Sequence, residues 1–138
     1  MRLCVDTPVE LPLRVQEDVV SVRQAVRSQA VAMGLTLVDQ TKLVTAASEL
    51  ARNTVIHGGG GVVKLEVIQK SEKRGIRLTF DDKGPGIRDI EQALRDGFTT
   101  GTGLGLGLGG ARRLTSEFSI ESKPGAGTRV VITQWSKR

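Results

Sequence analysis

The stretch GTGLGLGLGG, residues 101–110, has glycine at six of its ten positions. Glycine costs backbone entropy wherever the chain is ordered, so such a concentration needs a physical reason. Gly105, Gly107 and Gly110 match G-x-G-x-x-G, but no apolar run precedes them to form the strand of a dinucleotide-binding fingerprint. The chain also lacks G-x-x-x-x-G-K followed by Ser or Thr, the phosphate loop. Two interpretations stay open. Backbone N–H groups of the stretch wrap phosphate oxygens, or the stretch is only a flexible loop or a packing crossover.

Upstream lies a second glycine-containing turn, DKGPGI at residues 82–87. The predicted strand before it alternates apolar with polar residues, and Asp82 has the parity of the apolar positions. A carboxylate at the end of a buried face needs hydrogen-bond donors to offset its desolvation. The exocyclic amine of adenine is a suitable donor, and Gly84 and Gly86 leave room for a flat ring. The alternative is an aspartate that only caps its own turn.

Further upstream, SELARN at residues 48–53 lies on a predicted helix. Glu49 and Asn53 are four residues apart, so their side chains share one helix face at the edge of the core. A carboxylate there can accept a proton from a hydroxyl group, and an amide oxygen suits a hard cation such as Mg²⁺. The alternative is a solvated Glu and Asn. His57, at the helix end, is interpreted as a cap or packing residue with no catalytic role.

The apolar pattern of the whole chain predicts alternating helices and strands. Helices are expected over residues 15–33, from Asp39 as N-cap to the glycines at 58–61, over 89–95, and through ARRLTSEF at 111–118. Strands are expected over 11–15, 63–67, 76–81, 117–122 and 128–135, with KSEKRG at 70–75 as a hairpin connection. Because the two middle strands and the two final strands form hairpins, we expect a two-layer α/β sandwich. Its sheet is mixed and mainly antiparallel, with helices on one face.

Composition limits the class of protein. The 138 residues suit one domain, which we place at residues 1–138, and 38% hydrophobic residues can bury an ordinary core. Cys4 is the single cysteine, so no internal disulfide forms. The net charge of +5 allows an acidic partner or nucleotide phosphates, but three Phe, one Trp and no Tyr argue against nucleic-acid binding. No apolar run suits a membrane span or signal peptide, so a cytoplasmic protein is expected.

Four motifs in a fixed order carry a family resemblance: SELARN, DKGPGI, GTGLGLGLGG and GAGT. They resemble the asparagine box, the two glycine boxes and the final Gly-Thr of the GHKL (HATPase_c-like) ATP-binding superfamily, which has the Bergerat fold. From TAASELARN through DGFTTGTGLGLGLGGARRLTSEFS to Trp135, nearly the whole chain resembles the RsbT-type serine/threonine kinases of bacterial sigma-factor control.

The resemblance implies a role for each matching residue. Glu49 would be the general base or would orient the attacking hydroxyl, and Asn53 would hold the Mg²⁺ that bridges the triphosphate. Asp82 would bond the adenine amine. The remaining positions would shape the adenine pocket (Gly84, Gly86), form the lid and phosphate cradle (Gly101, Gly103, Gly105, Gly107) and support the adenine side (Thr128). The glycine-rich stretch would then close over phosphates and open to release ADP.

By the same resemblance, the activity is Mg-ATP-dependent transfer of a phosphoryl group to Ser or Thr of a STAS-domain antagonist protein in a partner-switching pathway. A downstream phosphatase or sigma-pathway regulator is a further implied partner. The alternative is a nucleotide-gated module that sequesters or activates a partner, with catalysis secondary. A detached histidine-kinase domain fits less well, since Glu49 stands where those kinases resemble one another in having Asn.

Overall fold

The fold is built on one antiparallel sheet. A computed structural model describes residues 4–5, 8–87, 89–94 and 107–136. The described strands are β1 (Cys4–Val5), β2 (Val9–Leu13), β3 (Gly61–Lys70), β4 (Lys73–Asp82), β5 (Glu117–Ser122) and β6 (Thr128–Trp135). They follow the order β1–β3–β4–β6–β5, and β2 also pairs with β3. The sequence predicts a mixed, mainly antiparallel sheet. Every pairing between the described strands is antiparallel.

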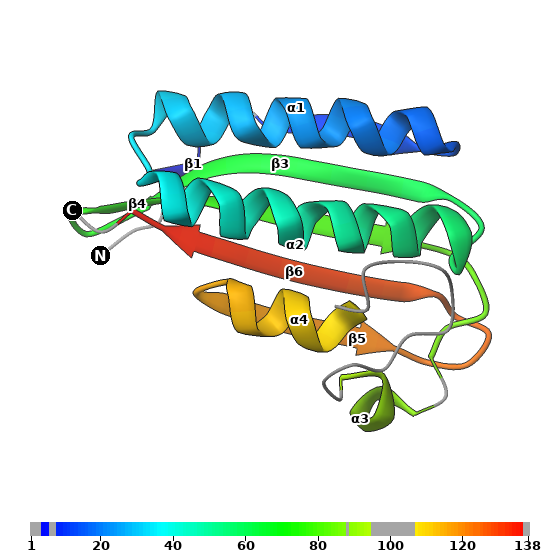
Figure 1. The fold of residues 1–138 in the computed structure, drawn as a ribbon. Helices are drawn as coiled ribbons and strands as arrows, with labels where there is room; N and C mark the ends of the chain where they lie inside the picture. Colours follow the sequence, from blue (N-terminus) through cyan, green and yellow to red (C-terminus); the bar gives the residue numbers. More distant parts are fainter. Residues whose placement is uncertain (1–3, 6–7, 88, 95–106, 137–138) are drawn as a thin grey trace.

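Three helices cover one face of this sheet, namely α1 (Gln16–Ala32), α2 (Leu37–Ile56) and α4 (Gly107–Leu114) (Figure 1). The single turn α3 (Ile90–Ala93) replaces the longer helix expected over 89–95. Gly34 follows α1 with a φ of 77°, the left-handed conformation expected of a residue that ends a helix. The predicted two-layer α/β sandwich with helices on one face is confirmed.

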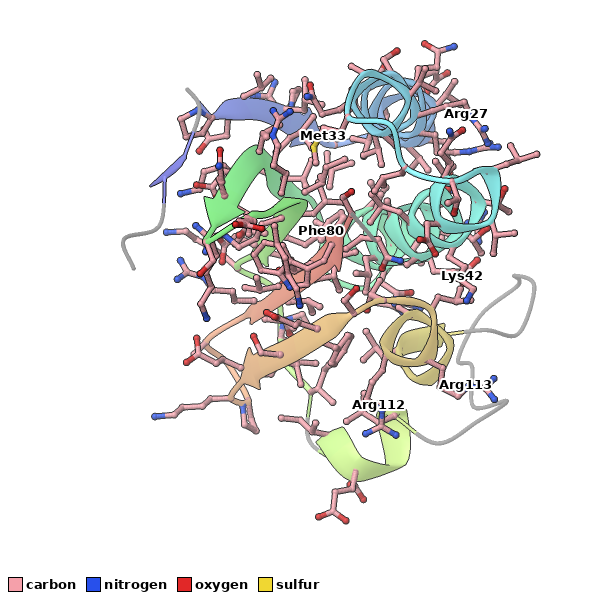
Figure 2. The ribbon with its side chains drawn as sticks, turned by 90° about the vertical axis from the view of Figure 1, so that its left-hand side faces the viewer. Arg27, Met33, Lys42, Phe80, Arg112 and Arg113 are labelled. Atoms are coloured by element: carbon pink, nitrogen blue, oxygen red, sulfur yellow. The ribbon has the colours of Figure 1, made fainter. Side chains whose placement is uncertain are left out.

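The core lies between the sheet and the three helices. Alternate residues of β4 point into it, and Ile76, Leu78 and Phe80 are each at most 2% exposed. The facing stripe of α2 includes Leu43 and Leu50, both nearly inaccessible to solvent. Figure 2 shows Phe80 between the two layers. The predicted parity of β4 is therefore confirmed, and it places Asp82 on the core side at the strand's end.

The start of α2 differs from the prediction of Asp39 as N-cap. Thr36 is the N-cap, and its Oγ1 accepts a hydrogen bond from the Asp39 backbone N–H at 3.1 Å. The sequence offers two capping residues three positions apart, and the first of them starts the helix. The two residues between them, Leu37 and Val38, are exposed, so the apolar pattern carries no sign of this first turn.

The helix predicted through ARRLTSEF also has different bounds. It begins earlier, at Gly107, and ends at Leu114, because Glu117 already pairs with Thr133 of β6. The Ser116 backbone N–H donates to Gln134 Oε1 at 3.0 Å, which fixes the turn between helix and strand.

The first strand and the middle hairpin also have different bounds. The strand predicted over 11–15 ends at Leu13, and the middle hairpin is tighter than expected, with only residues 71 and 72 between its strands.

Candidate nucleotide-binding site

A cavity of about 450 Å³ lies where α2 and β4 end and α4 begins. Its lining includes five residues that the sequence predicts for nucleotide binding: Asn53, Asp82, Gly86, Gly107 and Thr128. Apolar side chains make up much of the remaining wall, among them Leu50, Phe80, Ile87, Leu108 and Val130. A largely apolar cavity with a few convergent polar groups is typical of a small-molecule site.

Asp82 is held by the backbone around it. Its Oδ1 accepts a hydrogen bond from the Gly84 backbone N–H at 2.9 Å, the turn-capping contact that the sequence left as an alternative role. The side chain also lines the cavity, so the turn contact and a ligand contact are compatible. A Cβ on Gly58 would overlap the Asp82 carboxylate, and a Cβ on Gly84 would lie 2.6 Å from the Gly58 carbonyl oxygen. Glycine at positions 58 and 84 therefore leaves the space in which the Asp82 carboxylate lies.

The neighbouring carboxylate, Asp81, has different surroundings. Successive side chains of a strand point to opposite faces, and Asp81 Oδ1 accepts a hydrogen bond from Arg129 Nε at 2.7 Å on the exposed side. This bond, together with the charge of Asp81, raises the pKa of the Arg129 guanidinium. Of the two adjacent carboxylates, Asp82 is the one that lines the apolar cavity.

The loop after β4 is bound to the turn between β5 and β6. The Ile87 backbone N–H donates to Ser122 Oγ at 2.7 Å, and the Gly125 N–H donates to the Pro85 carbonyl oxygen at 2.6 Å. Gly86 has a φ of 79°, and a Cβ there would overlap the backbone of Lys123. Glycine is therefore required at position 86 for both conformation and space, and the loop that faces the cavity is supported by the final hairpin.

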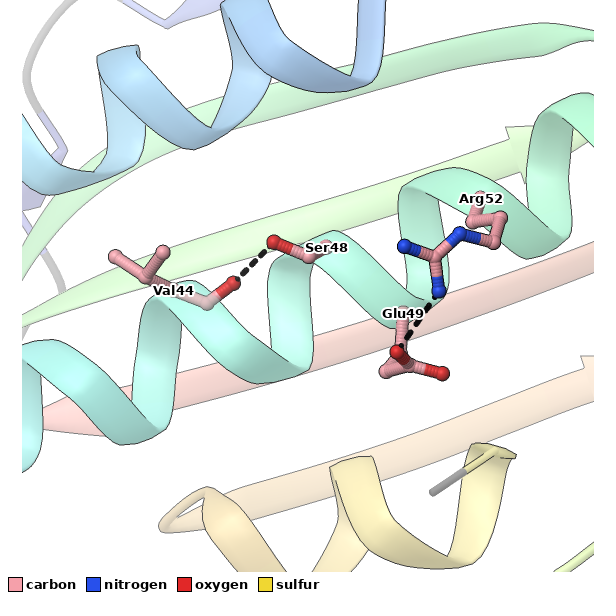
Figure 3. A network of polar contacts seen from close by, with 4 residues as sticks. All are labelled: Val44, Ser48, Glu49 and Arg52. Atoms are coloured by element: carbon pink, nitrogen blue, oxygen red, sulfur yellow. Dashed lines mark hydrogen bonds and ion pairs between the residues drawn. The ribbon is translucent and has the colours of Figure 1, made fainter. Parts of the chain in front are cut away.

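On α2 the structure separates the two residues that the sequence placed together. Asn53 is half-buried and lines the cavity. Glu49, one turn earlier, is 6% exposed, and its Oε2 pairs with Arg52 Nη1 at 3.0 Å (Figure 3). Glu49 is not among the described residues that line the cavity. The two side chains share a helix face, as predicted, but only Asn53 reaches the described wall.

Comparison with known proteins places the chain in a family. Residues 38–137 match the histidine kinase-, DNA gyrase B- and HSP90-like ATPases. The chain is also 42% identical to serine/threonine-protein kinase RsbT of Bacillus subtilis over 118 residues, which cover 86% of this chain and 89% of that protein. The chain belongs to this ATPase family. Within the family it is of the RsbT type, the serine/threonine kinases.

Other relatives of the ATPase family agree with this assignment. The anti-sigma F factor of Thermoanaerobacter sp. is 32% identical over 118 residues, 82% of each chain. A crystal structure of the RsbU and RsbW domains of a Mycobacterium tuberculosis protein matches with a TM-score of 0.65 at 23% identity, over 96% of this chain and 34% of that longer chain. The mycobacterial sensor histidine kinase MprB matches with a TM-score of 0.54 at 18% identity, over 94% of this chain and 97% of that one. The two structures show the fold alone.

The glycines predicted for this site fall into three cases. Gly101, Gly103 and Gly105, predicted for the lid, lie outside the described residues. Gly107, also predicted for the lid, is the first residue of α4 and has a φ of 57°. It lines the cavity, so the N-terminus of α4 lies at the cavity wall. Gly84 does not line the cavity and acts instead through its contact with Gly58.

Some residues that line the cavity or support its wall were not predicted from the sequence. His57, the C-cap of α2, lines the cavity in addition to ending its helix, and Gly58 contacts both the cavity and Asp82. The glycines after the helix were the available signal for Gly58. Ser122 had no local signal, because its importance comes from Ile87, which is 35 residues away.

Two further observations concern metals and membranes. Within residues 4–5, 8–87, 89–94 and 107–136, no group of three or more His, Cys, Asp or Glu side chains could hold a metal ion. The helices of that same part are too short or too polar to cross a bilayer. A metal at the cavity would therefore have few protein ligands from the described chain, with Asn53 as the amide predicted for it.

Proposed function

We propose that the cavity binds Mg-ATP and that the chain, acting in the cytoplasm as one kinase domain, transfers the γ-phosphoryl group to Ser or Thr of a STAS-domain antagonist protein. The observation that carries the proposal is the convergence of Asn53, Asp82 and Thr128 on one cavity. These residues come from three segments that lie far apart in the chain. Each has the chemistry that the family resemblance requires at its position.

The donor and acceptor groups fit an adenine nucleotide. The Asp82 carboxylate can accept a hydrogen bond from the adenine amine. Phe80, Ile87 and Val130 supply apolar surface for the faces and edges of the ring. A cavity of about 450 Å³ also falls within the range of small-molecule sites.

The site also fits the way in which Mg²⁺ is held in phosphoryl-transfer proteins. Mg²⁺ keeps several waters and is bound through substrate phosphates with only one or two protein groups. The Asn53 amide oxygen is a ligand of this kind, and the absence of an acidic cluster in the described chain is compatible with it. When bound, the ion would neutralise charge on the phosphates, while Asn53 fixes where it sits.

Glu49 is proposed as the general base. It lies one helical turn before Asn53, and its carboxylate is buried and held by Arg52. A carboxylate so placed can accept the proton of a serine or threonine hydroxyl while Asn53 and Asp82 hold the nucleotide. Most of the catalysis would come from positioning and from stabilisation of phosphate charge, as in other phosphoryl transfers.

The names of two relatives support the proposed pathway. One is named a serine/threonine-protein kinase and another an anti-sigma F factor. We infer that this chain acts in the same kind of partner-switching pathway, on a STAS-domain protein.

One observation favours the second candidate, a nucleotide-gated binding module. Glu49 does not line the described wall of the cavity, and its Oε2 is already paired with Arg52. In that alternative, ATP or ADP in the cavity changes the affinity for a partner, and phosphoryl transfer is secondary.

A transfer assay separates the two candidates. The chain is incubated with γ-labelled ATP and a candidate STAS-domain protein. The same STAS-domain protein with its acceptor Ser or Thr changed to Ala is the control. We expect Mg²⁺-dependent label on the STAS-domain protein and none on the control. Nucleotide-dependent binding without label would support the binding module. If the chain binds no ATP, both candidates are wrong.

A further inference from the structure

Ser122, the last residue of β5, meets three polar groups beside the cavity. Its Oγ accepts a hydrogen bond from the Ile87 backbone N–H at 2.7 Å. It also lies 3.1 Å from the Gly127 carbonyl oxygen and 2.8 Å from Thr128 Oγ1. Thr128 is its direct cross-strand neighbour on β6 and lines the cavity. Ser122 therefore connects the loop after β4 to a residue of the proposed nucleotide site.

Counting hydrogens assigns a direction to each of these bonds. A serine hydroxyl has one hydrogen to donate, and a carbonyl oxygen can only accept. The contact with Gly127 therefore uses the hydrogen of Ser122. The contact between the two hydroxyls must then use the hydrogen of Thr128. With these directions, each of the three contacts of Ser122 has one donor and one acceptor, and no other assignment of the hydrogens achieves this.

The arrangement has a consequence for the cavity. The Thr128 hydroxyl donates to Ser122, so its oxygen offers only lone pairs to a ligand. The Asp82 carboxylate likewise only accepts, and Oδ1 already accepts from Gly84. The polar groups that β4 and β6 contribute to the cavity wall, Asp82 and Thr128, are thus both acceptors.

We propose that Ser122 is a positioning residue that fixes the direction of the Thr128 hydroxyl and thereby makes the site select a purine with a 6-amino group over one with a 6-keto group. The inference rests on the proposed binding of ATP. An amino group donates to both acceptors, whereas a keto oxygen placed there meets lone pairs and leaves them unpaired. A site built to pair with a donor discriminates strongly against an analogue that lacks it.

ATP and inosine triphosphate test the proposal, because their bases differ at position 6 and in the protonation of N1. Their affinities are measured by calorimetry for the wild type and for Ser122→Ala. We expect the wild type to prefer ATP by about tenfold or more and Ser122→Ala to reduce this ratio by about fivefold, since Thr128 is then free to donate. Ser119→Ala, an exposed serine on the same strand, is the matched control and should keep the wild-type ratio.

A second pair of variants keeps the shape of the side chain constant. Ser122→Thr retains the hydroxyl and should keep the preference for ATP. Ser122→Val, whose side chain has the shape of threonine without the hydroxyl, should reduce it about fivefold, as Ser122→Ala does. In a Thr128→Val background, Ser122→Ala should cause no further change in the ratio, because the two residues act through one hydrogen bond.

The outcomes separate this inference from the proposed function. A wild type that binds neither nucleotide overturns the proposed function itself. A wild type that prefers ATP, with Ser122→Ala and Ser122→Val retaining the same preference, overturns only the role of Ser122. Equal weakening of both nucleotides by these variants would show a merely structural role and would also overturn it.

Discussion

At the scale of single residues, two neighbouring aspartates at the end of β4 have different roles because their side chains point to opposite faces of the sheet. Asp81 and Asp82 are chemically identical and adjacent. Asp81 faces the exposed side and pairs with Arg129, whereas Asp82 lies at the end of the buried face and lines the cavity. The strand alternation that separates them makes Asp81 a close control for Asp82.

We predict that Asp82→Asn weakens ATP binding about tenfold or more, because it removes a charged acceptor for the adenine amine at a partly buried site. Asp81→Asn should leave the affinity unchanged. Calorimetric titration of both variants with Mg-ATP measures the difference. Equal affinity of Asp82→Asn and wild type would show that Asp82 does not contact the nucleotide.

Single-residue reasoning from the sequence reached Asp82 and Asn53 because strand parity and helical spacing place side chains without knowledge of the fold. It did not reach Gly58, whose one signal was its place among the glycines after α2, or Ser122, which had none. These residues act through Asp82 and Ile87, which are 24 or more positions away, and no local pattern encodes such contacts. The ion pair of Glu49 with Arg52 lies within one helical turn, yet spacing alone does not show that the carboxylate is buried.

At the scale of elements, the first turn of α1 depends on Asp18. Its Oδ2 accepts hydrogen bonds from the backbone N–H groups of Arg14 and Val15, at 2.8 and 3.1 Å. These bonds lower the pKa of the Asp18 carboxyl below its ordinary value of 3.8. The carboxylate therefore stabilises the folded state above that value, and the contribution is lost as pH falls through the lowered pKa.

Asp18→Asn should accordingly be less stable than the wild type at pH 7, and the difference should shrink as the pH falls below 3.8. Urea unfolding of the two proteins across this pH range provides the measurement. Glu17→Gln, a change at the exposed neighbouring acid, is the control and should show little such dependence. A difference that stays constant with pH would contradict the role of the Asp18 charge.

Element bounds were predicted well where local chemistry decides them and poorly where distant pairing does. The helix predicted over 15–33 ends close to its expected end, because Gly34 adopts a left-handed conformation that depends on local chemistry alone. Residues 117 and 118 belong to a strand because β6 pairs with them, although the preceding ARRLTS continues a helical pattern. At the start of α2, Thr36 and Asp39 are both good caps, and propensity alone does not choose between them.

At the scale of the whole molecule, the sheet buries one face against the helices. Leu78 on β4 is fully buried in the core, whereas the next residue, Thr79, points to the opposite face and is half-buried. Leu78→Ala should lower the free energy of unfolding by about 2–5 kcal/mol, and Thr79→Ala by less than about 1 kcal/mol. Denaturant unfolding of both variants tests the layer arrangement. Similar losses for the two would contradict a sandwich with a single core.

The architecture followed from the sequence because its two hairpins are local and force neighbouring antiparallel strands. The cavity did not follow from the hairpins. It forms where α2, β4, α4 and the final hairpin meet, and its expected existence came from the order of four motifs that resemble one family. The pairing of β4 with β6, which brings Asp82 opposite Thr128, joins segments about one third of the chain apart.

In the proposed mechanism, Asn53 holds the nucleotide and Glu49 takes part in the chemistry. The most direct test measures ATP affinity and transfer to the STAS-domain protein for Asn53→Ala and Glu49→Gln. Glu66→Gln is the control, because Glu66 is also a buried carboxylate paired with an arginine, on β3 and away from the cavity wall. Unfolding midpoints of all three variants exclude simple destabilisation.

We predict that Glu49→Gln binds ATP nearly normally but transfers phosphate about 10²–10⁴-fold more slowly, the usual effect of losing a general base. Asn53→Ala should lose nucleotide affinity together with transfer, and Glu66→Gln should retain both. Transfer by Glu49→Gln at the wild-type rate would show that Glu49 is not the general base.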